Sequence, residues 1–561
     1  MVDRNLASAL QLTEDCHDEE ISSAIIALLT SAVYDPEPRK TLPEIYQLIT
    51  NLGASSYLDP LNTLPLLLTC DDQGARDIIS VIGECSSAKE VVIAVQEAAE
   101  RLEHSLEADE EGDGEPEEQA KEAEEPPEKT KRISISNQLI ALMDIYASAI
   151  PRMKLRRKSA SDTLVPLLQE LEAIIGPASG KATRTEGRLL LFSAATLAKR
   201  VRGWVDLVSL EDEEDVKACK AIIKRLLDSA LIACEGLIQA NVAQRTLEEC
   251  FPRLGLRSRT ESDWEEGEKA ILEILEAYSS LGIFTGEING PCSAGDLVFW
   301  AHKSSTQQDP EKLISFLLPA LISSFQTNTF LDESLAVLLR GLHTRLTGNT
   351  GTTDDLPHDI TVPLYGFLPS VASAHPDPPI RFQAFRILSL LLASGSQQLR
   401  FHHLVELTRD SEFPQMRVAS VGLVKEALLQ ALSEGKENIF LGPLFLRTFG
   451  PILFRPDPPD IFSSALALKD FEETHEPARL AECLSLYYFL LQRDEQNLTG
   501  IRDKDAIQSI ESNLLTPLRN NLSRWMDDPS VSKSHLHDIT AIVSLKISLE
   551  RVDAARAVLK Q

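Results

Sequence analysis

Apolar residues recur three or four positions apart in two segments of the stretch 381–432. The two stripes consist of Phe382, Phe385, Leu388, Leu392, Val421, Val424, Leu428 and Leu432. This spacing places each set on one face of a helix, where it can be buried against a neighbouring element. Gly395 is expected to end the first helix, and Pro414 to lie in the first turn of the later one. The pattern is typical of stacked helical hairpins, in which each pair is buried only against its neighbours.

The same helical spacing of apolar residues recurs along most of the chain. Helices are predicted over 88–102, 133–150, 163–175, 186–203, 213–240, 265–281, 313–325, 331–346 and 480–491. Pro166 is placed in a first turn, whereas Pro363 and Pro369 break the helical pattern of 361–373. Alternating β-branched runs between turn residues are few, and no fixed repeat period stands out. We therefore predict an all-α fold, an irregular HEAT/armadillo-like α-solenoid with a disordered acidic insertion.

Residues 103–131 lack this helical spacing of apolar residues. Between Glu103 and Glu128 the chain has 13 acidic residues and one basic residue, and Leu106 is the only large apolar side chain. Such a segment buries too little apolar surface to fold, so it is predicted to be disordered and to contribute little to stability. The predicted organisation is N-terminal helical repeats (1–102), the acidic insertion (103–131), middle helical repeats (132–290) and C-terminal helical repeats (291–561).

The composition limits the function classes. The 561 residues carry a net charge of −30, which disfavours direct binding to nucleic acid or anionic membranes. Basic partners are allowed, although solubility alone could explain the charge. The chain does not begin with a secretory signal pattern, and no apolar stretch approaches the roughly 20 residues of a membrane span. The eight cysteines are scattered without a Cys-x-x-Cys pair, as in a reduced intracellular protein. We expect a soluble cytoplasmic protein that could also enter the nucleus.

Within the segment 400–426, RFHHLVELTRDSEFPQMRVASVGLVKE, a Pro-containing turn precedes the pattern Arg-x-Ala-x-x-Gly-Leu-x-Lys. The residues of the pattern are Arg417, Ala419, Gly422, Leu423 and Lys425. This block resembles the best-marked block of the glomulin and fungal Yap-binding protein family, which includes lateral-root-formation proteins. We interpret the block as structural: Gly422 would permit close helix packing, and Arg417 would donate hydrogen bonds to carbonyls of the preceding helix.

The resemblance implies a non-catalytic helical-repeat protein that binds other proteins and needs no cofactor. The fungal Yap-binding branch supports oxidative activation of an AP-1-like bZIP transcription factor, partly alongside a thiol peroxidase. The glomulin branch instead caps the RING subunit of cullin ubiquitin ligases through C-terminal helical repeats, and a related fungal branch is associated with kinetochores. An adaptor in the oxidative-stress response is the expected function. A cullin-ligase inhibitor and a kinetochore-associated scaffold are the alternatives.

A basic turn precedes Ser159. Arg156, Arg157 and Lys158 suit a kinase that recognises basic residues, and a phosphate on Ser159 would reverse the local charge. Ser159 is therefore a candidate phosphorylation site. The alternative interpretation is a solvated loop between helices, whose cations could pair with the acidic insertion.

Two apparent ligand sites are explained without a ligand. His402, His403 and Glu406 contain metal-binding groups, but adjacent histidines point in different directions on a helix. Only one of them is therefore expected to share a face with Glu406, and a surface histidine pair is favoured over a metal site. The run GPASGKATRT resembles the end of a Walker A motif but has Ala182 where the magnesium-binding hydroxyl belongs, so nucleotide binding is not predicted.

The cysteines are expected to be unreactive. Cys219, Cys234 and Cys250 lie on or near predicted helices that are rich in apolar residues, where a thiol is normally buried. Cys16 lies in the polar run TEDCHDEE and is the best candidate for an exposed thiol, although its acidic neighbours disfavour the thiolate. We predict that Cys16→Ser, alone or with Cys292→Ser, leaves partner binding intact.

Overall fold

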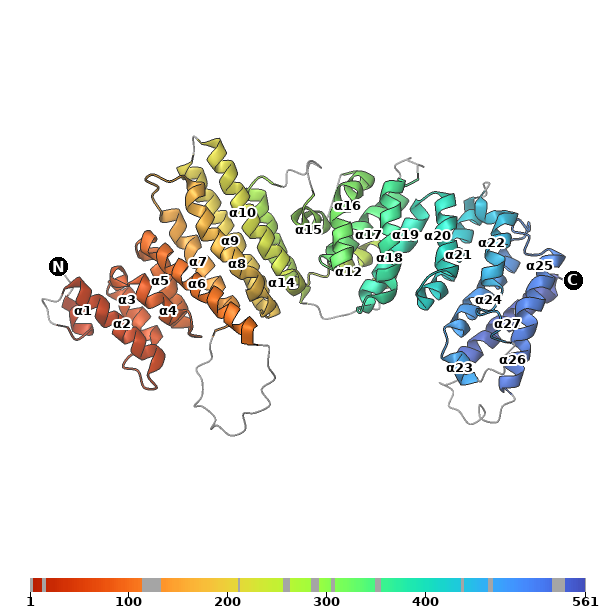
Figure 1. Cartoon of the computed structure of the whole chain (residues 1–561), viewed down its shortest axis with the longest axis horizontal. Coiled ribbons are helices and arrows are strands. Elements are labelled where there is room, and N and C mark those ends of the chain that lie inside the picture. Colours follow the sequence, from red (N-terminus) through yellow and green to blue (C-terminus); the bar gives the residue numbers. More distant parts are fainter. Residues whose placement is uncertain are drawn as a thin grey trace. The chain divides into compact units, whose positions relative to one another are not determined.

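The computed structural model describes residues 4–12, 17–112, 133–209, 212–255, 263–283, 292–303, 308–348, 355–434, 438–462, 468–526 and 540–559 (Figure 1). In these ranges every regular element is a helix and no β-strand occurs. The prediction of an all-α, solenoid-like fold is confirmed. None of the helices described combines enough length and apolar character to cross a membrane.

The chain divides into two units, which are described separately. Unit 1 comprises residues 1–241 and 258–303, and unit 2 comprises residues 242–257 and 304–561. A short piece of unit 2 is therefore inserted in the sequence of unit 1. The predicted boundary between middle and C-terminal repeats, after residue 290, stays a prediction.

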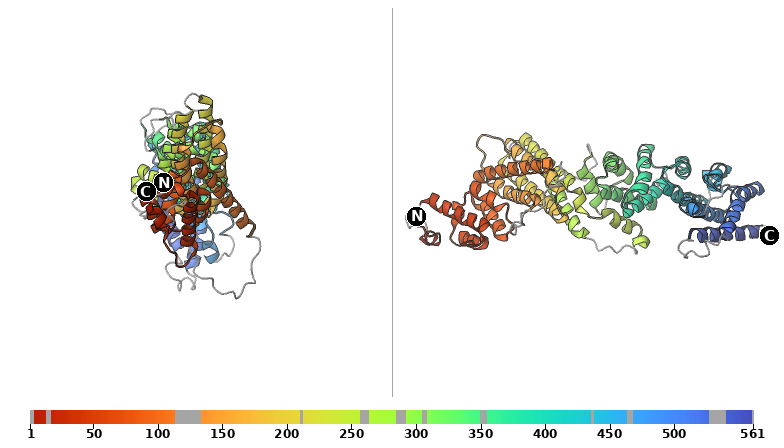
Figure 2. Two further views of the ribbon diagram at one scale, coloured as in Figure 1. Left: turned by 90° about the vertical axis from the view of Figure 1, so that its left-hand side faces the viewer. Right: turned by 60° about the horizontal axis from the view of Figure 1, so that its bottom comes forward.

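Unit 1 is built from helices that follow one another along the unit in nearly chain order (Figure 2). Its α-helices are α1 (Arg4–Ala9), α2 (Asp18–Tyr34), α3 (Leu42–Asn51), α4 (Pro60–Leu67), α5 (Gln73–Cys85), α6 (Ala88–Gly112), α7 (Ile135–Ala149), α8 (Ala160–Gly180), α9 (Arg184–Val208), α10 (Glu213–Ala233), α11 (Glu235–Ile238), α14 (Trp264–Ser280) and α15 (Ala294–His302). Two short 3₁₀ turns are η1 (Ala54–Tyr57) and η2 (Ile150–Arg152).

The predicted apolar stripes of α6 and α7 are buried in the core of unit 1. Helix α7 packs against α5, α6 and α9, while α8 packs along α10 and α9 packs along α14. The side chains predicted to face the core are buried: Val91, Val95, Ala98, Leu102, Leu139, Leu142, Met143 and Tyr146. Local capping sets the helix starts, as at α9, where Thr183 and Glu186 form a reciprocal capping box.

Unit 2 continues the same architecture. Its α-helices are α12 (Val242–Cys250), α13 (Pro252–Gly255), α16 (Pro310–Thr327), α17 (Leu331–Thr347), α18 (His358–Ala374), α19 (Pro378–Ser394), α20 (Gln397–Arg409), α21 (Pro414–Glu434), α22 (Pro443–Leu453), α23 (Leu468–Glu472), α24 (Glu476–Arg493), α25 (Lys504–Ile510), α26 (Thr516–Met526) and α27 (Thr540–Leu559). A 3₁₀ turn η3 (Ile439–Leu441) and a π-helical turn η4 (Glu511–Leu515) complete it.

Each helix of unit 2 packs on its neighbours. Helix α17 packs against α12, α16 and α19, and α21 packs against both α20 and α24. A carboxylate secures the inserted piece: Asp332 of α17 accepts hydrogen bonds from the N–H groups of Val242 and Ala243, at 2.7 and 2.9 Å. These N–H groups open α12 and would otherwise lack a partner in the helix.

Several predicted helix boundaries are wrong. Helix α6 continues through Gly112, so the first part of the predicted acidic insertion is helical, and Leu106 is buried. Helix α8 begins at Ala160, which places Pro166 in its interior, and α10 ends at Ala233. Residues 113–132 lie outside the described residues, so the predicted disorder stays a prediction.

Prolines do not break α18, contrary to the prediction. Pro363 and Pro369 lie inside one continuous helix. Leu364 and Leu368 are fully buried on the same helix, and this burial offsets the hydrogen bonds that the two prolines cannot donate.

The predicted face of α19 is also partly wrong. Phe382 is 47% exposed, whereas Gln383 and Ala384 are buried together with Leu388 and Leu392. The predicted ends of this helix region are confirmed, since α19 stops before Gly395 and the later helix begins at Pro414.

Candidate functional site

The block 400–426 forms most of α20, the turn after it and the first half of α21. In the turn, the Ser411 hydroxyl accepts a hydrogen bond from the N–H of Phe413 at 3.3 Å. Asp410 accepts one from Arg409 Nε at 2.9 Å. Pro414 follows as the first residue of α21, where its missing N–H has no consequence for the helix. The sequence of the turn therefore explains why one helix ends and the next begins here.

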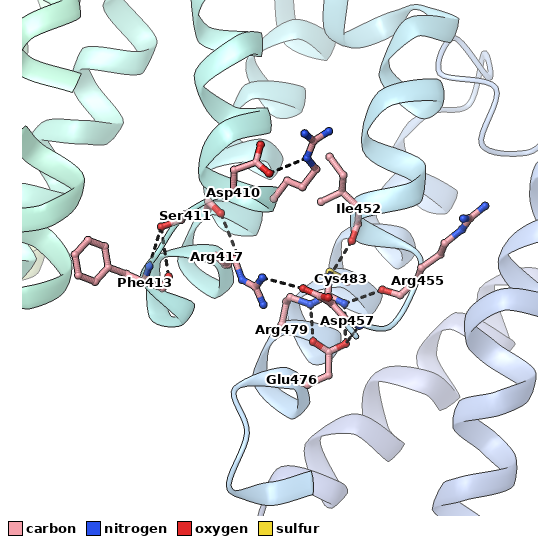
Figure 3. A network of polar contacts seen from close by, with 12 residues as sticks. Asp410, Ser411, Phe413, Arg417, Ile452, Arg455, Asp457, Glu476, Arg479 and Cys483 are labelled. Atoms are coloured by element: carbon pink, nitrogen blue, oxygen red, sulfur yellow. Dashed lines mark hydrogen bonds and ion pairs between the residues drawn. The ribbon is translucent and has the colours of Figure 1, made fainter. Parts of the chain in front are cut away.

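The Arg417 side chain contacts a segment that comes later in the sequence. Its Nη1 lies 2.8 Å from Asp457 Oδ2, and the Asp457 N–H donates to Glu476 Oε1 at 2.9 Å (Figure 3). The prediction that Arg417 satisfies carbonyls of the preceding helix is wrong. The residue instead ties α21 to the Pro-rich segment after α22, whose Asp457 also contacts Glu476 of α24.

A buried ion pair lies at the end of this chain of contacts. Arg479 donates to both carboxylate oxygens of Glu476, each at 2.7 Å, and the two side chains are 5% and 3% exposed. The guanidinium also donates to the carbonyls of Ile452 and Arg455, at 2.9 and 2.7 Å. Figure 3 shows these partners converging on the guanidinium. Five N–H donors in a planar fork suit such a set of acceptors.

The ion pair shifts the pKa of both partners. Burial raises the pKa of Glu476, and the hydrogen bonds from Arg479 oppose part of that rise. Burial alone would lower the pKa of Arg479, but the hydrogen bonds to Glu476 outweigh it, so the pKa is raised and the guanidinium stays charged. Both groups hold helices together, and neither faces solvent where a substrate could bind.

The remaining residues of the block have different surroundings. Leu423 is buried in the core, and Ala419 is half-buried. Gly422 does not serve close helix packing as predicted, because a Cβ built there would meet no atom within 4 Å. Lys425 points its Nζ over the ring of Phe489, 5.7 Å from the centroid, and lies 3.5 Å from the Ser485 hydroxyl. The block thus contributes one cation to the side of α24.

A groove of about 1150 Å³ lies beyond Lys425, at the end of α21. Helix α21, η3 and the end of α24 supply its walls, together with the N-terminal residues Gln397 and Gln398 of α20. Its apolar lining consists of Leu429, Leu432, Ile439, Leu441, Phe489 and Leu498. Leu429 and Leu498 are 45% and 42% exposed, so the groove presents apolar side chains to solvent within a mostly polar rim. We call these residues the α21 groove.

The histidine pair differs from the prediction. Both rings reach Glu406: His402 Nε2 lies 3.3 Å and His403 Nδ1 lies 2.9 Å from its carboxylate oxygens. The spacings of three and four residues both bring a side chain to the same helix face, which explains the shared partner. His403 also stacks on Tyr365 with ring centroids 4.0 Å apart, and burial lowers its pKa despite Glu406. Among the residues described, no group of three or more His, Cys, Asp or Glu side chains is arranged to hold a metal ion.

The cysteines described are mostly shielded. Cys219, Cys234 and Cys483 are buried, and burial raises the pKa of each thiol to about 12. Burial also raises the pKa of Cys250, which is only half-buried, contrary to the prediction. Cys85, the last residue of α5, lies between Glu84 and Ser86 and is exposed. Cys16 lies outside the described residues. A thiolate is therefore costly at most of these positions.

Two further predicted positions lie in unit 1. Ser159 caps the N-terminus of α8, where its hydroxyl accepts a hydrogen bond from the Asp162 N–H at 3.0 Å. Gly176 and Gly180 belong to the last turns of α8, and Lys181 is its C-cap. The Walker-like run is thus mostly helical, with no strand before it.

The α21 groove and the buried pair of α24 were missed by sequence reasoning. The spacing of Glu476 and Arg479 would allow an intrahelical ion pair, but it gives no sign that the pair is buried. The groove combines residues that are up to about 100 positions apart in the chain, which no local pattern can reveal.

Comparison with known protein families supports one assignment. Residues 291–550 match the model of a family described as YAP/Alf4/glomulin. This part of the chain resembles the YAP/Alf4/glomulin family. The match contains the block 400–426, the α21 groove and the buried ion pair, so the resemblance based on the block is confirmed. No curated protein matches the chain closely enough to be reported as a relative.

Proposed function

We propose that this chain is a non-catalytic adaptor that binds other proteins. The observation that carries the proposal is the match of residues 291–550 to a family whose description names YAP and glomulin proteins. Helical-repeat folds commonly present extended binding surfaces between their repeats. The α21 groove, with its exposed leucines beside the family block, is the binding site that we assign to this function.

The specific role that we propose is support of oxidative-stress activation of an AP-1-like bZIP transcription factor, together with a thiol peroxidase. The net charge of −30 favours a partner with a basic segment, such as the DNA-binding region of a bZIP factor. The shielded cysteines favour a scaffold over a participant in thiol exchange. The proposed location is the cytoplasm, with access to the nucleus.

Affinity purification from peroxide-treated and untreated cells tests this role. The full chain should recover a bZIP factor and a thiol peroxidase, with greater recovery after peroxide. Leu429→Asp places a charge in the α21 groove and should abolish the recovery. Leu444→Asp is the matched control, because Leu444 is equally exposed, at 45%, but does not line the groove. Recovery of neither partner would contradict the stress role, and equal loss in both variants would contradict the groove.

A second candidate is inhibition of a cullin ubiquitin ligase through its RING subunit, because the family description also names glomulin. A ubiquitination assay with purified cullin and RING subunits separates the two functions. Inhibition that Leu429→Asp relieves would support this candidate. Unchanged ubiquitination at micromolar concentrations of the chain would contradict it.

A further inference from the structure

The loop between η2 and α8 presents a run of three consecutive cations to solvent. Arg156, Arg157 and Lys158 are exposed, and none of them forms an ion pair with the part of the chain that the structure describes. The start of the loop is held in place, since Trp204 Nε1 donates to the carbonyl of Met153 at 3.2 Å. The cations are therefore displayed on a short anchored loop and are available to an acidic partner.

Ser159 ends this loop and caps α8. A second anionic group already occupies the same helix end: Asp215 of α10 accepts hydrogen bonds from the N–H groups of Ala160 and Ser161, at 3.1 and 3.0 Å. The Ser209 hydroxyl donates to the same carboxylate at 2.7 Å. Burial alone would raise the pKa of Asp215, but these hydrogen bonds lower it to about 2, so the group is ionised at neutral pH. Asp215 thereby joins α10 to the first turn of α8.

We propose that Ser159 is phosphorylated by a protein kinase that recognises arginines two and three positions before its target, and that the phosphate weakens the junction of α8 and α10. The kinase transfers the γ-phosphoryl group of ATP. The bond between the γ-phosphorus and the β–γ bridging oxygen breaks, a bond from phosphorus to Ser159 Oγ forms, the hydroxyl proton is released and ADP leaves. Arg156 and Arg157 supply the contacts that carboxylates in the kinase groove recognise.

The phosphate acts through competition for the helix end. It carries a charge of about −1.5 to −2 at neutral pH and accepts hydrogen bonds from the N–H groups of a first helical turn. Those N–H groups are the ones that Asp215 uses, and Asp162 adds another negative charge in the same turn. The phosphate and Asp215 repel each other at short range, so the hydrogen bonds between Asp215 and the first turn of α8 are weakened.

Access to Ser159 requires the first turn of α8 to open, because Ser159 is half-buried and Ala160 is fully buried. Helix ends open locally at a lower free energy than the whole domain. The folded chain is therefore phosphorylated more slowly than a peptide of residues 153–163, but at the same serine.

Phosphorylation of the full chain by the catalytic subunit of cyclic-AMP-dependent protein kinase tests the site. Mass spectrometry should find the phosphate on Ser159. Ser159→Ala should abolish it, Ser161→Ala should retain it as the matched control, and Arg156→Ala with Arg157→Ala should slow it at least about tenfold. Absence of phosphate from Ser159 in the folded chain, or an unchanged rate without the arginines, overturns the proposal.

The effect on the α8–α10 junction is measured on the phosphorylated chain. The unfolding temperature of unit 1 should fall by about 2–4 °C on phosphorylation. In Asp215→Asn the same modification should have no such effect, because the repelling charge is gone. Hydrogen exchange at residues 160–163 provides a second measurement that does not depend on how stable this variant is. Faster exchange there is expected only when Asp215 and the phosphate are both present. The mechanism is overturned if phosphorylation lowers the unfolding temperature, or speeds the exchange, as much in Asp215→Asn as in the unaltered chain.

Discussion

Helices α7 of unit 1 and α19 of unit 2 both carry an apolar stripe, but only in α7 is the whole predicted stripe buried. Leu139 and Leu142 of α7 are fully buried, as their spacing predicts. In α19, Phe382 is 47% exposed while its neighbour Gln383 is only 3% exposed. The same rule of helical spacing therefore succeeds in one helix and fails at one end of the other.

The difference comes from the partners that the tertiary structure supplies. Gln383 Nε2 donates to Gln244 Oε1 of α12 at 3.2 Å, so the amide can be buried without losing its hydrogen bond. Helix α24 shows the same effect more strongly, because Glu476 and Arg479 are both buried through their mutual contacts. The comparison teaches that a polar residue faces inward where a distant segment offers it a partner.

The test with the largest expected loss of stability removes a buried charge from α24. Arg479→Ala should lower the free energy of unfolding of unit 2 by about 3–5 kcal/mol, because Glu476 is left buried without its partner. Denaturation in urea measures the loss. Arg409→Ala is the control, since its ion pair with Asp410 is more than half exposed and should contribute no more than about 1 kcal/mol. Equal losses in the two variants would show that the buried pair does not support the fold.

The second test compares two adjacent leucines. Leu428→Ala should cost roughly 2–5 kcal/mol, because Leu428 is fully buried in the core of unit 2. Leu142→Ala should cost a similar amount in α7. Leu429 is 45% exposed, and Leu429→Ala should change stability by about 0.5 kcal/mol or less. An unchanged unfolding midpoint for Leu428→Ala would contradict the assigned face of α21.

The third test uses acid. Arg519 and Arg556 both contact Glu511, and although burial alone would raise its pKa, their hydrogen bonds lower it from 4.5 to about 2. The pKa is lower in the folded than in the unfolded chain, so this stabilisation is present above about pH 4.5 and is lost as the pH falls towards 2. Glu511→Gln should remove about 1.5–3 kcal/mol at pH 7 and flatten the dependence between pH 4.5 and 2. A parallel acid curve for the variant would contradict this role.

The fourth test addresses α19 directly. Gln383→Ala should cost about 1 kcal/mol, because it leaves the carbonyl of Gln244 without this donor. Phe382→Ala should cost about 0.5 kcal/mol or less despite the larger side chain that is removed. A larger loss of stability for Phe382→Ala than for Gln383→Ala, measured by thermal unfolding, would support the buried face that the sequence predicts.

The smallest effect is expected at Gly422. Gly422→Ala should raise the stability of unit 2 by about 0.5–1 kcal/mol, because the added Cβ meets no neighbour and alanine favours the helix. A loss of stability, in contrast, would revive the prediction that this glycine permits close packing.

The sequence by itself determined the helical nature of the chain and many of its core positions. Apolar spacing located α6, α7 and α21, and Gly395 and Pro414 marked helix ends, because backbone constraints and amphipathic spacing act over a few residues. The short block from Arg417 to Lys425 also pointed to the family whose model matches residues 291–550. These features depend on local chemistry, which the order of residues contains.

Only the tertiary structure decided where polar and functional groups meet. Arg417 pairs with Asp457, 40 positions later, rather than with the preceding helix, and Asp215 caps a helix that begins 55 residues earlier. The α21 groove likewise combines residues of helices α20, α21 and α24, of the turn η3 and of the segment after α24. Such contacts depend on which segments pack together in space, and hydrophobic spacing within one helix carries no information about the distant partner that a buried polar group will find.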